Sequence, residues 1–200
     1  QFPVRLINFN WMLPGHPNGS QYSYDGLDGL KTGFTDLAKY CFTATAEKNG
    51  LRLISVVMRT ESESARFAET RKLLDYGFKN FGYHTFAEKG DKVAGSETLS
   101  VAQGKELEVP VVLGKSLEAL IQLEETDQYT IEVEPIPDLV NEQGELVAPL
   151  EEGEPVASAR LVYNGELQFG SLGPAQGLEA PLVTEQAVEE AGLIRKAWRG

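Results

Sequence analysis

The stretch LDGLKTGFT at residues 27–35 contains the triplet Lys31-Thr32-Gly33 and is the most informative part of the sequence. Its first residues have the pattern of a short strand that follows a polar loop. Two further strands are expected at residues 41–46 and 51–58, with Asn49-Gly50 between them. Because Asn-Gly accepts the positive φ angles of a tight hairpin turn, we expect these two strands to pair antiparallel beside the triplet strand.

A helix is expected after the hairpin. Thr60-Glu61-Ser62-Glu63 fits a capping box, in which Thr60 caps the amide of Glu63 and Glu63 reaches back. Apolar residues then recur at helical spacing, at positions Phe67, Leu74, Phe78 and Phe81. This helix should cover one face of the sheet, with Arg66, Arg71 and Lys72 pointing elsewhere. Residues 4–13, before the polar loop, read as a further extended strand.

The charge of the chain changes at about residue 84. Residues 1–84 carry 10 Lys and Arg against 8 Asp and Glu, a net charge of +2, whereas residues 85–183 carry 5 against 19, a net charge of −14. Such a break favours two domains. The acidic half would be repelled by phosphates, so nucleic acid is not expected as a partner.

Residues 85–183 show short alternating runs separated by Gly and Pro, which predict an all-β sandwich. Residues 184–200 are expected to form an amphipathic helix with acidic residues early and Arg195, Lys196 and Arg199 late. The tail fits an ordinary terminal helix. It also fits the start of a membrane-surface helix anchored by Trp198 and the basic residues, and the tail by itself does not decide between them.

Metal and cofactor chemistry has little support in the sequence. Cys41 is the only cysteine, and His16 and His84 lie far apart without ligand spacing. We expect no metal and no cofactor. Asp28 is interpreted as a structural strand residue, because no second carboxylate is placed to work with it, and Asp36 is interpreted as a turn residue.

The quoted strand resembles the signature strand of the low-molecular-mass D-Ala-D-Ala carboxypeptidases, which are penicillin-binding proteins. Lys-Thr-Gly is one of the elements of this active-site serine superfamily. Residues 41–58 and 66–78 resemble the family's next two strands and closing helix, and the acidic half and the tail resemble its second domain and the start of its membrane anchor.

The resemblance therefore implies an α+β fragment of a β-lactamase/transpeptidase-like domain, an antiparallel sheet plus covering helix, over residues 1–84. An all-β sandwich domain at 85–183 and the start of an amphipathic membrane-anchor helix at 184–200 would follow.

Two elements of the family's active site are missing from these 200 residues. No serine has a lysine three positions later, and none begins a Ser-x-Asn sequence. In the family both elements precede the Lys-Thr-Gly triplet, so we expect them upstream of Gln1, through truncation or on a partner fragment. By itself the chain should have neither a nucleophile nor a general base.

The resemblance also assigns roles to residues that are present. Lys31 would supply a cation to the cleft, Thr32 a hydroxyl to the terminal carboxylate of the substrate, and Gly33 room for close approach. The amide of Phe34 would be one oxyanion-hole donor. Arg66 would bind the free carboxylate through its guanidinium fork, although a solvated arginine in a first helical turn is an equally good reading.

The implied activity is that of a serine-type carboxypeptidase which removes the terminal D-alanine from peptidoglycan stem peptides and is trapped by β-lactams. It would act at the outer face of the cytoplasmic membrane, held peripherally by the C-terminal helix. Two alternatives stay open at this point. One is a β-lactamase or transpeptidase of the same superfamily, and the other is a non-catalytic, β-rich cell-wall binding module.

Overall fold

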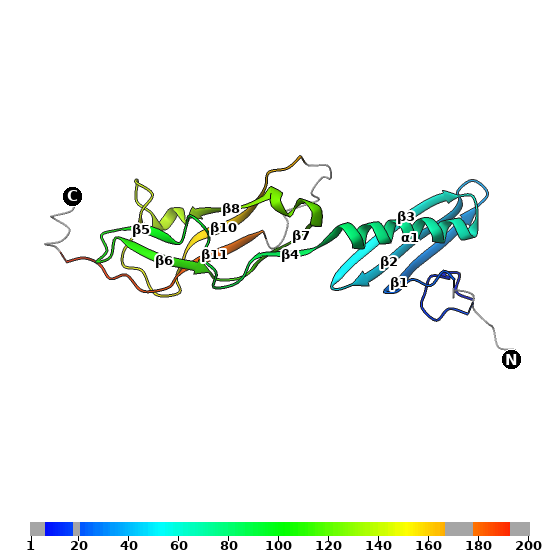
Figure 1. Ribbon diagram of the computed structural model, residues 1–200, viewed down its shortest axis with the longest axis horizontal. Coiled ribbons are helices and arrows are strands. Elements are labelled where there is room, and N and C mark those ends of the chain that lie inside the picture. The colour runs from blue at the N-terminus through cyan, green and yellow to red at the C-terminus, as the bar shows by residue number, and fades with distance from the viewer. Residues whose placement is uncertain (1–6, 18–20, 167–177, 193–200) are drawn as a thin grey trace. The chain divides into compact units, whose positions relative to one another are not determined.

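The computed structural model describes residues 7–17, 21–166 and 178–192 (Figure 1). The chain divides into two compact units, Gln1–Gly82 and Tyr83–Gly200. Each unit has its own core, and each is described separately below.

Unit 1 is built on a three-stranded antiparallel sheet of β1 (Leu27–Thr35), β2 (Lys39–Lys48) and β3 (Leu51–Thr60), in the order β1-β2-β3. Asn49 and Gly50 join β2 to β3 with φ angles of 51° and 78°. Positive φ at both central residues is the geometry that lets a two-residue turn follow the twist of its strands. The predicted hairpin is therefore confirmed, and β1 is left at an edge of this sheet.

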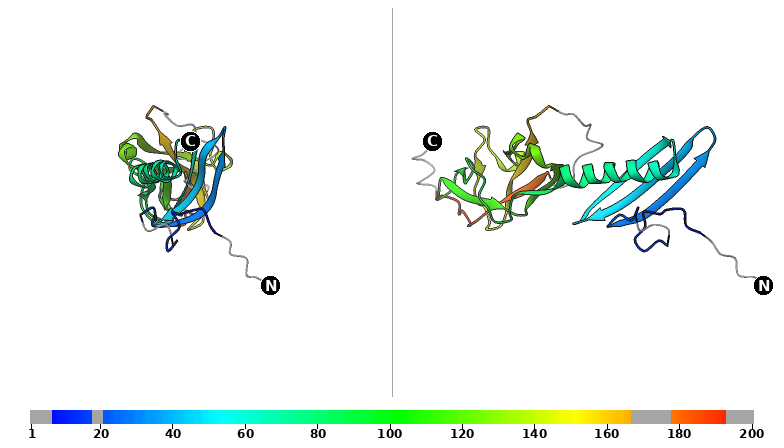
Figure 2. Two further views of the ribbon diagram at one scale, coloured as in Figure 1. Left: turned by 90° about the vertical axis from the view of Figure 1, so that its right-hand side faces the viewer. Right: turned by 45° about the vertical axis from the view of Figure 1, so that its right-hand side comes forward.

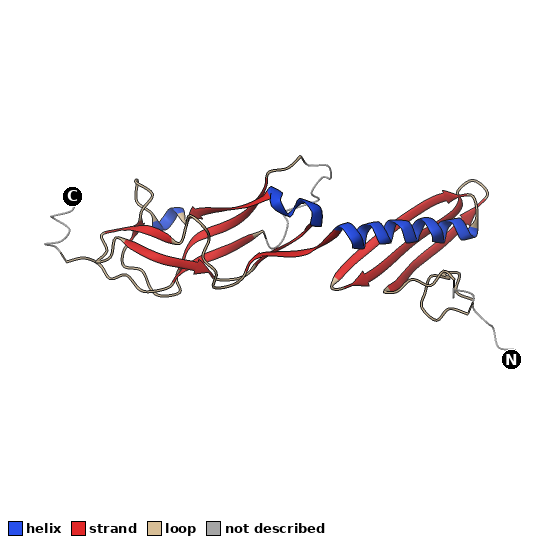
Figure 3. Ribbon diagram, in the orientation of Figure 1, coloured by secondary structure: helices blue, strands red, loops and turns tan. Residues whose placement is uncertain are grey.

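One helix, α1 (Glu63–Asn80), lies along one face of this sheet (Figures 2 and 3). Phe67 and Leu74 of α1 are each 1% exposed and pack with buried residues of the sheet. Gly77 permits the close approach, since a Cβ there would lie 2.4 Å from Leu53 Cδ1. The predicted helix is present, but Phe81 ends it with an extended backbone instead of continuing its apolar face.

The start of α1 differs from the predicted capping box. Ser62, not Thr60, is the N-cap, and its hydroxyl accepts a hydrogen bond from the amide of Ala65. The Thr60 hydroxyl instead donates to the backbone of Tyr40, which draws Thr60 into the end of β3. Thr60 and Ser62 are both suitable N-cap residues. Because Thr60 belongs to β3, Ser62 is the residue that caps the helix.

The segment before β1 is not the extended strand that its apolar residues predict. Residues 7–10 have no regular structure and turns follow from Trp11. The Asn8 side chain accepts from the amide of Asn10, and the Asn10 side chain accepts from the amide of Met12. Such local bonds from Asn to the backbone two residues later compete with strand pairing. They direct Met12, which is fully buried, into the core of unit 1.

Unit 2 is built from strands, as expected from its alternating runs (Figure 3). Its larger sheet has the order β8-β10-β11-β6-β5-β9, and β4 pairs with β7 in a second, two-stranded sheet. The strands are β4 (Phe81–Ala87), β5 (Thr98–Ala102), β6 (Glu108–Leu113), β7 (Leu117–Gln122), β8 (Tyr129–Pro135), β9 (Leu146–Val147), β10 (Pro155–Tyr163) and β11 (Glu179–Thr184). Two short 3₁₀ helices, Leu123–Gln128 and Pro137–Leu139, join them. One core cluster takes buried side chains from both sheets, including Leu117 and Leu182.

The prediction of an amphipathic helix over residues 184–200 is wrong for residues 184–192, the first nine. Thr184 ends β11, residues 185–186 form a bend, and isolated bridges follow at Val188 and Glu190. Val188 and Leu150 exchange both backbone hydrogen bonds at 2.9 Å, and the amide of Ala191 donates to Gln103. These pairings bury Val188 and Ala191. Tertiary contacts therefore outweigh the local sequence pattern that favoured a helix here. Residues 193–200 lie outside the described part of the chain.

Among the described residues, no helix combines the length and the apolar character needed to cross a membrane.

Candidate active site

The strand β1 places the residues of the triplet on opposite faces of the sheet. Thr32 lies opposite Phe42 of β2, whereas Lys31 lies opposite Thr43. Directly paired residues share a face, and Phe42 is buried beneath α1. Thr32 is therefore on the face that α1 covers. Lys31 and Gly33 are on the other face, where both are exposed.

The exposed residues of the triplet, Lys31 and Gly33, make few contacts with the rest of unit 1. The Lys31 ammonium donates to the backbone oxygen of Thr32 at 2.6 Å. A Cβ built on Gly33 would lie 3.9 Å from the Cβ of Cys41, an ordinary contact, and its φ is not in the left-handed region. Neither packing within the described chain nor backbone conformation therefore demands glycine here. A requirement for space beside the strand edge explains the residue better.

Arg66 is buried, unlike a solvated residue of a first helical turn. Its side chain is 4% exposed, and one terminal nitrogen donates to Glu63 Oε1 at 2.6 Å. The guanidinium carbon lies 4.8 Å from the ring centre of Phe67 and 5.6 Å from that of Tyr40. Burial lowers the pKa of Arg66, and the nearby Glu63 opposes that effect. The sequence-based expectation that Arg66 points away from the sheet is wrong.

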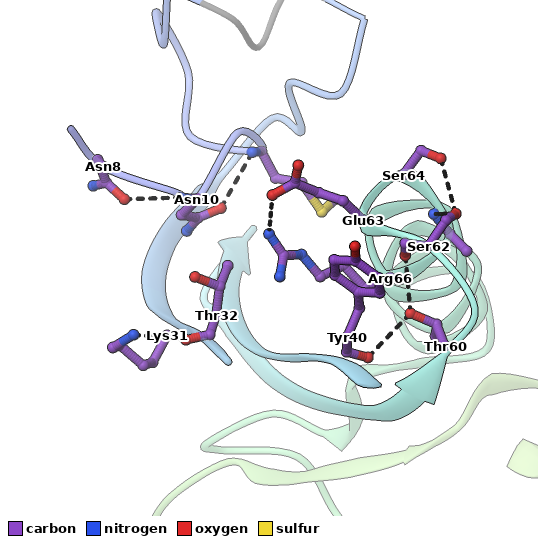
Figure 4. Close-up of polar contacts among 12 residues, drawn as sticks. Asn8, Asn10, Lys31, Thr32, Tyr40, Thr60, Ser62, Glu63, Ser64 and Arg66 are labelled. Carbon is purple, nitrogen blue, oxygen red and sulfur yellow. Dashed lines mark hydrogen bonds and ion pairs between the residues drawn. The ribbon is translucent and has the colours of Figure 1, made fainter. Parts of the chain in front are cut away.

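Aromatic rings connect Arg66 to the triplet strand. The ring of Tyr40, which stacks near Arg66, lies 4.6 Å from the ring of Phe34 on β1. Phe34 is 53% exposed and pairs with Tyr40 across the sheet. Thr32 and Phe34 thus share one face of β1, on the side of Tyr40 and Arg66, whereas Lys31 lies on the reverse side of the strand. Figure 4 shows Thr32, Tyr40 and Arg66 in this region.

Two neighbours of this region were missed by the sequence interpretation. Glu63 had a signal, because an acidic residue three positions before an arginine in a helix predicts an ion pair. Tyr40 had none, since its place beside Arg66 depends on the packing of α1 against β2. Within the described residues, no group of three or more His, Cys, Asp or Glu side chains is arranged to hold a metal ion.

Comparison with known families agrees with this arrangement of strand, hairpin and helix. Residues 1–62 match the family of D-alanyl-D-alanine carboxypeptidases, and residues 81–190 match the C-terminal domain of penicillin-binding protein 5. The second match covers more than half of the chain. The chain therefore belongs to the penicillin-binding-protein family of D-alanyl-D-alanine carboxypeptidases, and the resemblance read from its sequence is confirmed.

Individual relatives give the same result. The D-alanyl-D-alanine carboxypeptidase DacA of Escherichia coli is 33% identical over 200 residues, covering 98% of this chain and 44% of DacA. DacF of Bacillus subtilis is 26% identical over 189 residues, covering 94% of this chain and 42% of DacF. The crystal structure of a peptidoglycan synthesis regulatory factor (PBP3) from Streptococcus pneumoniae is similar with 27% identity and a TM-score of 0.52, over 90% of this chain and 47% of that one. The chain thus spans less than half the length of these relatives.

Proposed function

We propose that this chain supplies the carboxylate-binding side of the active site of a serine-type D-Ala-D-Ala carboxypeptidase. The complete enzyme would remove the terminal D-alanine from peptidoglycan stem peptides. The observation that carries the proposal is the position of Lys31-Thr32-Gly33 on an edge strand, with the buried Arg66 on the face that Thr32 shares. Family membership supplies the reaction type, and these residues supply the recognition.

In this proposal the free edge of β1 pairs with the backbone of an extended peptide, as exposed strand edges do in peptide recognition. The hydroxyl of Thr32 and the guanidinium of Arg66 bind the terminal carboxylate from one face. Lys31, on the other face, stabilises negative charge beside the nucleophile and favours proton transfer there. The open space at Gly33 admits the substrate, and the amide of Phe34 donates to the developing oxyanion.

The nucleophile is not among these 200 residues, because no Ser-x-x-Lys or Ser-x-Asn sequence is present. The proposal requires a segment or partner chain that carries both elements. Its serine would attack the peptide carbonyl, release D-alanine and form an acyl-enzyme, which water then hydrolyses. A β-lactam would acylate the same serine, and no cofactor is required for any of these steps.

We further propose that residues 1–84 are part of the catalytic domain, that residues 85–183 act as a spacer, and that the enzyme works at the outer face of the cytoplasmic membrane. With a charge of −14, residues 85–183 would be repelled by an anionic surface. Attachment would then depend on the C-terminal end, where Arg195, Lys196, Trp198 and Arg199 are candidates by residue type. Flotation with anionic vesicles tests this, and a complete protein that remains unbound would contradict it.

The test of the activity uses the complete protein, in which this sequence is joined to the segment with the serine. Lys31→Ala should slow acylation by peptide and by penicillin about 10- to 100-fold, as expected for loss of a charged contact of about 1.5–3 kcal/mol. Lys72→Ala is the matched control, because Lys72 is an exposed helix lysine that pairs with Glu69. Unchanged acylation in Lys31→Ala would remove Lys31 from the site. Products other than free D-alanine would favour a transpeptidase, and rapid turnover of the penicillin a β-lactamase.

A further inference from the structure

Strand β8 (Tyr129–Pro135) forms one end of the larger sheet of unit 2, whose order is β8-β10-β11-β6-β5-β9 (Figure 1). Its antiparallel register with β10 runs from Tyr129 opposite Tyr163 to Pro135 opposite Ala157. Within the described residues, β10 is the only strand that pairs with β8. The backbone groups on the other side of β8 therefore face no strand of the described chain, and such an edge is a template for a further strand.

The opposite end of the same sheet has no comparable edge. Strand β9 at that end has only two residues, Leu146 and Val147. Leu146 also forms a bridge with Val140, and the amide of Ala148 donates to the backbone of Ala102. In the part of the chain that the structure describes, β8 is thus the edge of this sheet that is long enough to pair with a peptide of several residues.

The inner face of β8 is only partly covered. Ile131 lies opposite Leu161 of β10, and Val133 lies opposite Ala159. Leu161 and Ala159 are 4% and 0% exposed, whereas Ile131 and Val133 are half-buried although they pack against the core. Directly opposite residues share a face, so the difference comes from the missing neighbour on the edge side. A strand paired along β8 would cover Ile131 and Val133 with apolar side chains at alternate positions.

The outer face of β8 carries negative charge that its neighbours do not balance. The side chains of Glu132 and Glu134 are 53% and 73% exposed. Both carboxylates lie 3.8 Å from the same nitrogen of Arg160, so one guanidinium serves two carboxylates at long range. Residues 123–135 contain five Asp and Glu and no Lys or Arg. Basic side chains on an added strand would therefore meet opposite charge across the new pairing.

The same glutamates argue against a second copy of this chain as the occupant. When two copies of one edge pair antiparallel, each face of the strand meets the same face of its copy. Glu132 and Glu134 would then lie opposite glutamates or Thr130. Like charges directly opposite each other are destabilising, and charged side chains on an edge strand discourage pairing between copies. A basic strand from a different protein has no such penalty.

We infer that β8 is a docking edge for an extended segment of a partner protein in which basic and apolar residues alternate. The backbone of that segment would pair with β8. Its apolar side chains would cover Ile131 and Val133, and its Lys or Arg side chains would face Glu132 and Glu134. In this mode of recognition the main-chain bonds provide affinity and the alternate side chains provide selectivity. The role belongs to unit 2 and does not depend on the activity proposed for unit 1.

The experiment adds the blocked peptide acetyl-Lys-Val-Lys-Val-Lys-Val-Lys-amide to the ¹⁵N-labelled 200-residue chain at low ionic strength and follows the amide chemical shifts. The shifts should move along β8 and on the facing residues of β10. The reordered peptide acetyl-Val-Lys-Lys-Val-Val-Lys-Lys-amide has the same composition but mixes the two faces. It should bind at least about fivefold more weakly, because a pairing that suits one residue then misplaces its neighbour. Added salt should weaken the binding of both peptides.

The double variant Glu132→Lys/Glu134→Lys reverses the charge of the outer face and leaves the apolar face unchanged. Its affinity for the alternating lysine peptide should fall at least about tenfold, since two attractive cross-strand pairs become repulsive. The corresponding glutamate peptide should bind this variant more tightly than it binds the wild-type chain. Glu132→Gln/Glu134→Gln avoids repulsion from Arg160 and should show a smaller loss for the lysine peptide, in the same direction.

Glu106→Lys/Glu108→Lys is the matched control, because it makes the same change of charge at two exposed glutamates beside and within β6, three strands along from β8. It should change the affinity for the lysine peptide less than about threefold, since distant exposed charges are screened. Equal effects of the test and control variants would overturn the inference. So would equal affinities for the ordered and reordered peptides, or β8 amides that do not move at millimolar peptide. Shifts in β8 that depend on the concentration of the chain itself would identify a second copy as the occupant and would also overturn it.

Discussion

The two units differ in how completely their buried polar side chains are hydrogen-bonded. Among the described residues, every buried side-chain nitrogen or oxygen without a hydrogen-bond partner belongs to unit 1. These atoms lie on Asn10, Trp11, Ser55, Arg66 and Thr70. Unit 2 buries fewer polar side chains, and its buried Thr184 has partners on both sides. Unpartnered buried groups are rare in native proteins, so unit 1 differs from unit 2 in this respect.

The apolar surface shows a weaker contrast. On the face of β3 away from α1, Ile54 is 67% exposed and Met58 is 72% exposed, with Val56 between them. In unit 2, by comparison, the strands direct residues such as Val109, Val111 and Leu182 into one core with no exposure at all. Unit 2 also exposes apolar side chains, with Leu107 at 54% and Leu120 at 49%, so the apolar surface separates the two units less clearly than the buried polar groups do.

The largest expected effect tests whether unit 2 is self-contained. Leu182→Ala removes a fully buried side chain of its core and should lower the free energy of unfolding of unit 2 by about 2–5 kcal/mol. Hydrogen exchange followed by mass spectrometry reports on each unit separately. Protection in β2 and β3 of unit 1 should not change. Leu120→Ala, at a position that is 49% exposed, is the control and should have a much smaller effect. Equal loss of protection in both units would show that they are not independent.

Replacing one buried threonine of each unit with valine, which has a similar shape, compares the buried hydroxyl groups of the two units directly. Thr70 and Thr184 are both buried, but only the hydroxyl of Thr184 is bonded within the described residues, to the backbone of Glu151 and Glu154. Thr184→Val should destabilise unit 2 by about 1–3 kcal/mol, because it removes the hydroxyl that bonds to part-buried backbone groups of Glu151 and Glu154. Thr70→Val should be neutral or stabilising for unit 1. Urea unfolding of both variants measures the difference, and a similar loss in Thr70→Val would show that its hydroxyl is satisfied after all.

The start of α1 sets where Arg66 lies and gives a smaller effect. Ser62→Ala should destabilise unit 1 by about 1 kcal/mol through loss of the N-cap. Thr60→Ala removes the residue that the sequence favoured as the cap. It should not expose the first amides of α1 to exchange, because the Thr60 hydroxyl bonds to Tyr40. Faster exchange at Ala65 in Thr60→Ala than in Ser62→Ala would reverse this assignment of the cap.

The smallest effect is confined to alkaline pH. Burial, helped by a hydrogen bond to Asp75, raises the pKa of Tyr24 in unit 1. A raised pKa in the folded state means that the stabilisation is complete below the unfolded value, about 10. It is lost as the pH rises above that value and through the higher folded pKa. Tyr24→Phe should flatten the fall in melting temperature of unit 1 above pH 10. A fall that is unchanged in the variant would assign the titration to another group.

In unit 2 the corresponding tyrosine is less buried. Its hydrogen bond to Glu125 is the main cause that raises the pKa of Tyr163 to about 12. The sign is the same, so the bond to Glu125 should persist through pH 10 and be lost near pH 12. Tyr163→Phe should affect only unit 2.

The sequence predicted features that depend on neighbouring residues better than features that depend on partners distant in sequence. The Asn49-Gly50 hairpin and the helix after it depend on residues close in sequence, and both are present. The expected helix after Thr184 failed because Val188 is held by Leu150, a partner 38 positions earlier that local spacing does not reveal. The expected strand before β1 failed for a local reason, since Asn8 and Asn10 turn the chain.

The site shows the same limit. Lys31, Thr32 and Gly33 were found from their order alone, and Arg66 was named only through the family resemblance. Alternation along a strand separates Lys31 from Thr32, yet the burial of Arg66 against Tyr40 and Phe67 requires the tertiary fold.

The proposed function requires that unit 1 binds the terminal carboxylate of the peptide and that unit 2 does not. The most direct test measures acylation of the complete protein by peptides that end in a free D-alanine carboxylate or in the amide. Arg66→Ala should slow the carboxylate peptide at least about tenfold more than the amide, because it removes a charge-assisted contact. Arg160→Ala, which removes an exposed arginine of unit 2 that pairs with Glu132 and Glu134, should slow neither. Equal losses for the two peptides in Arg66→Ala would contradict the account.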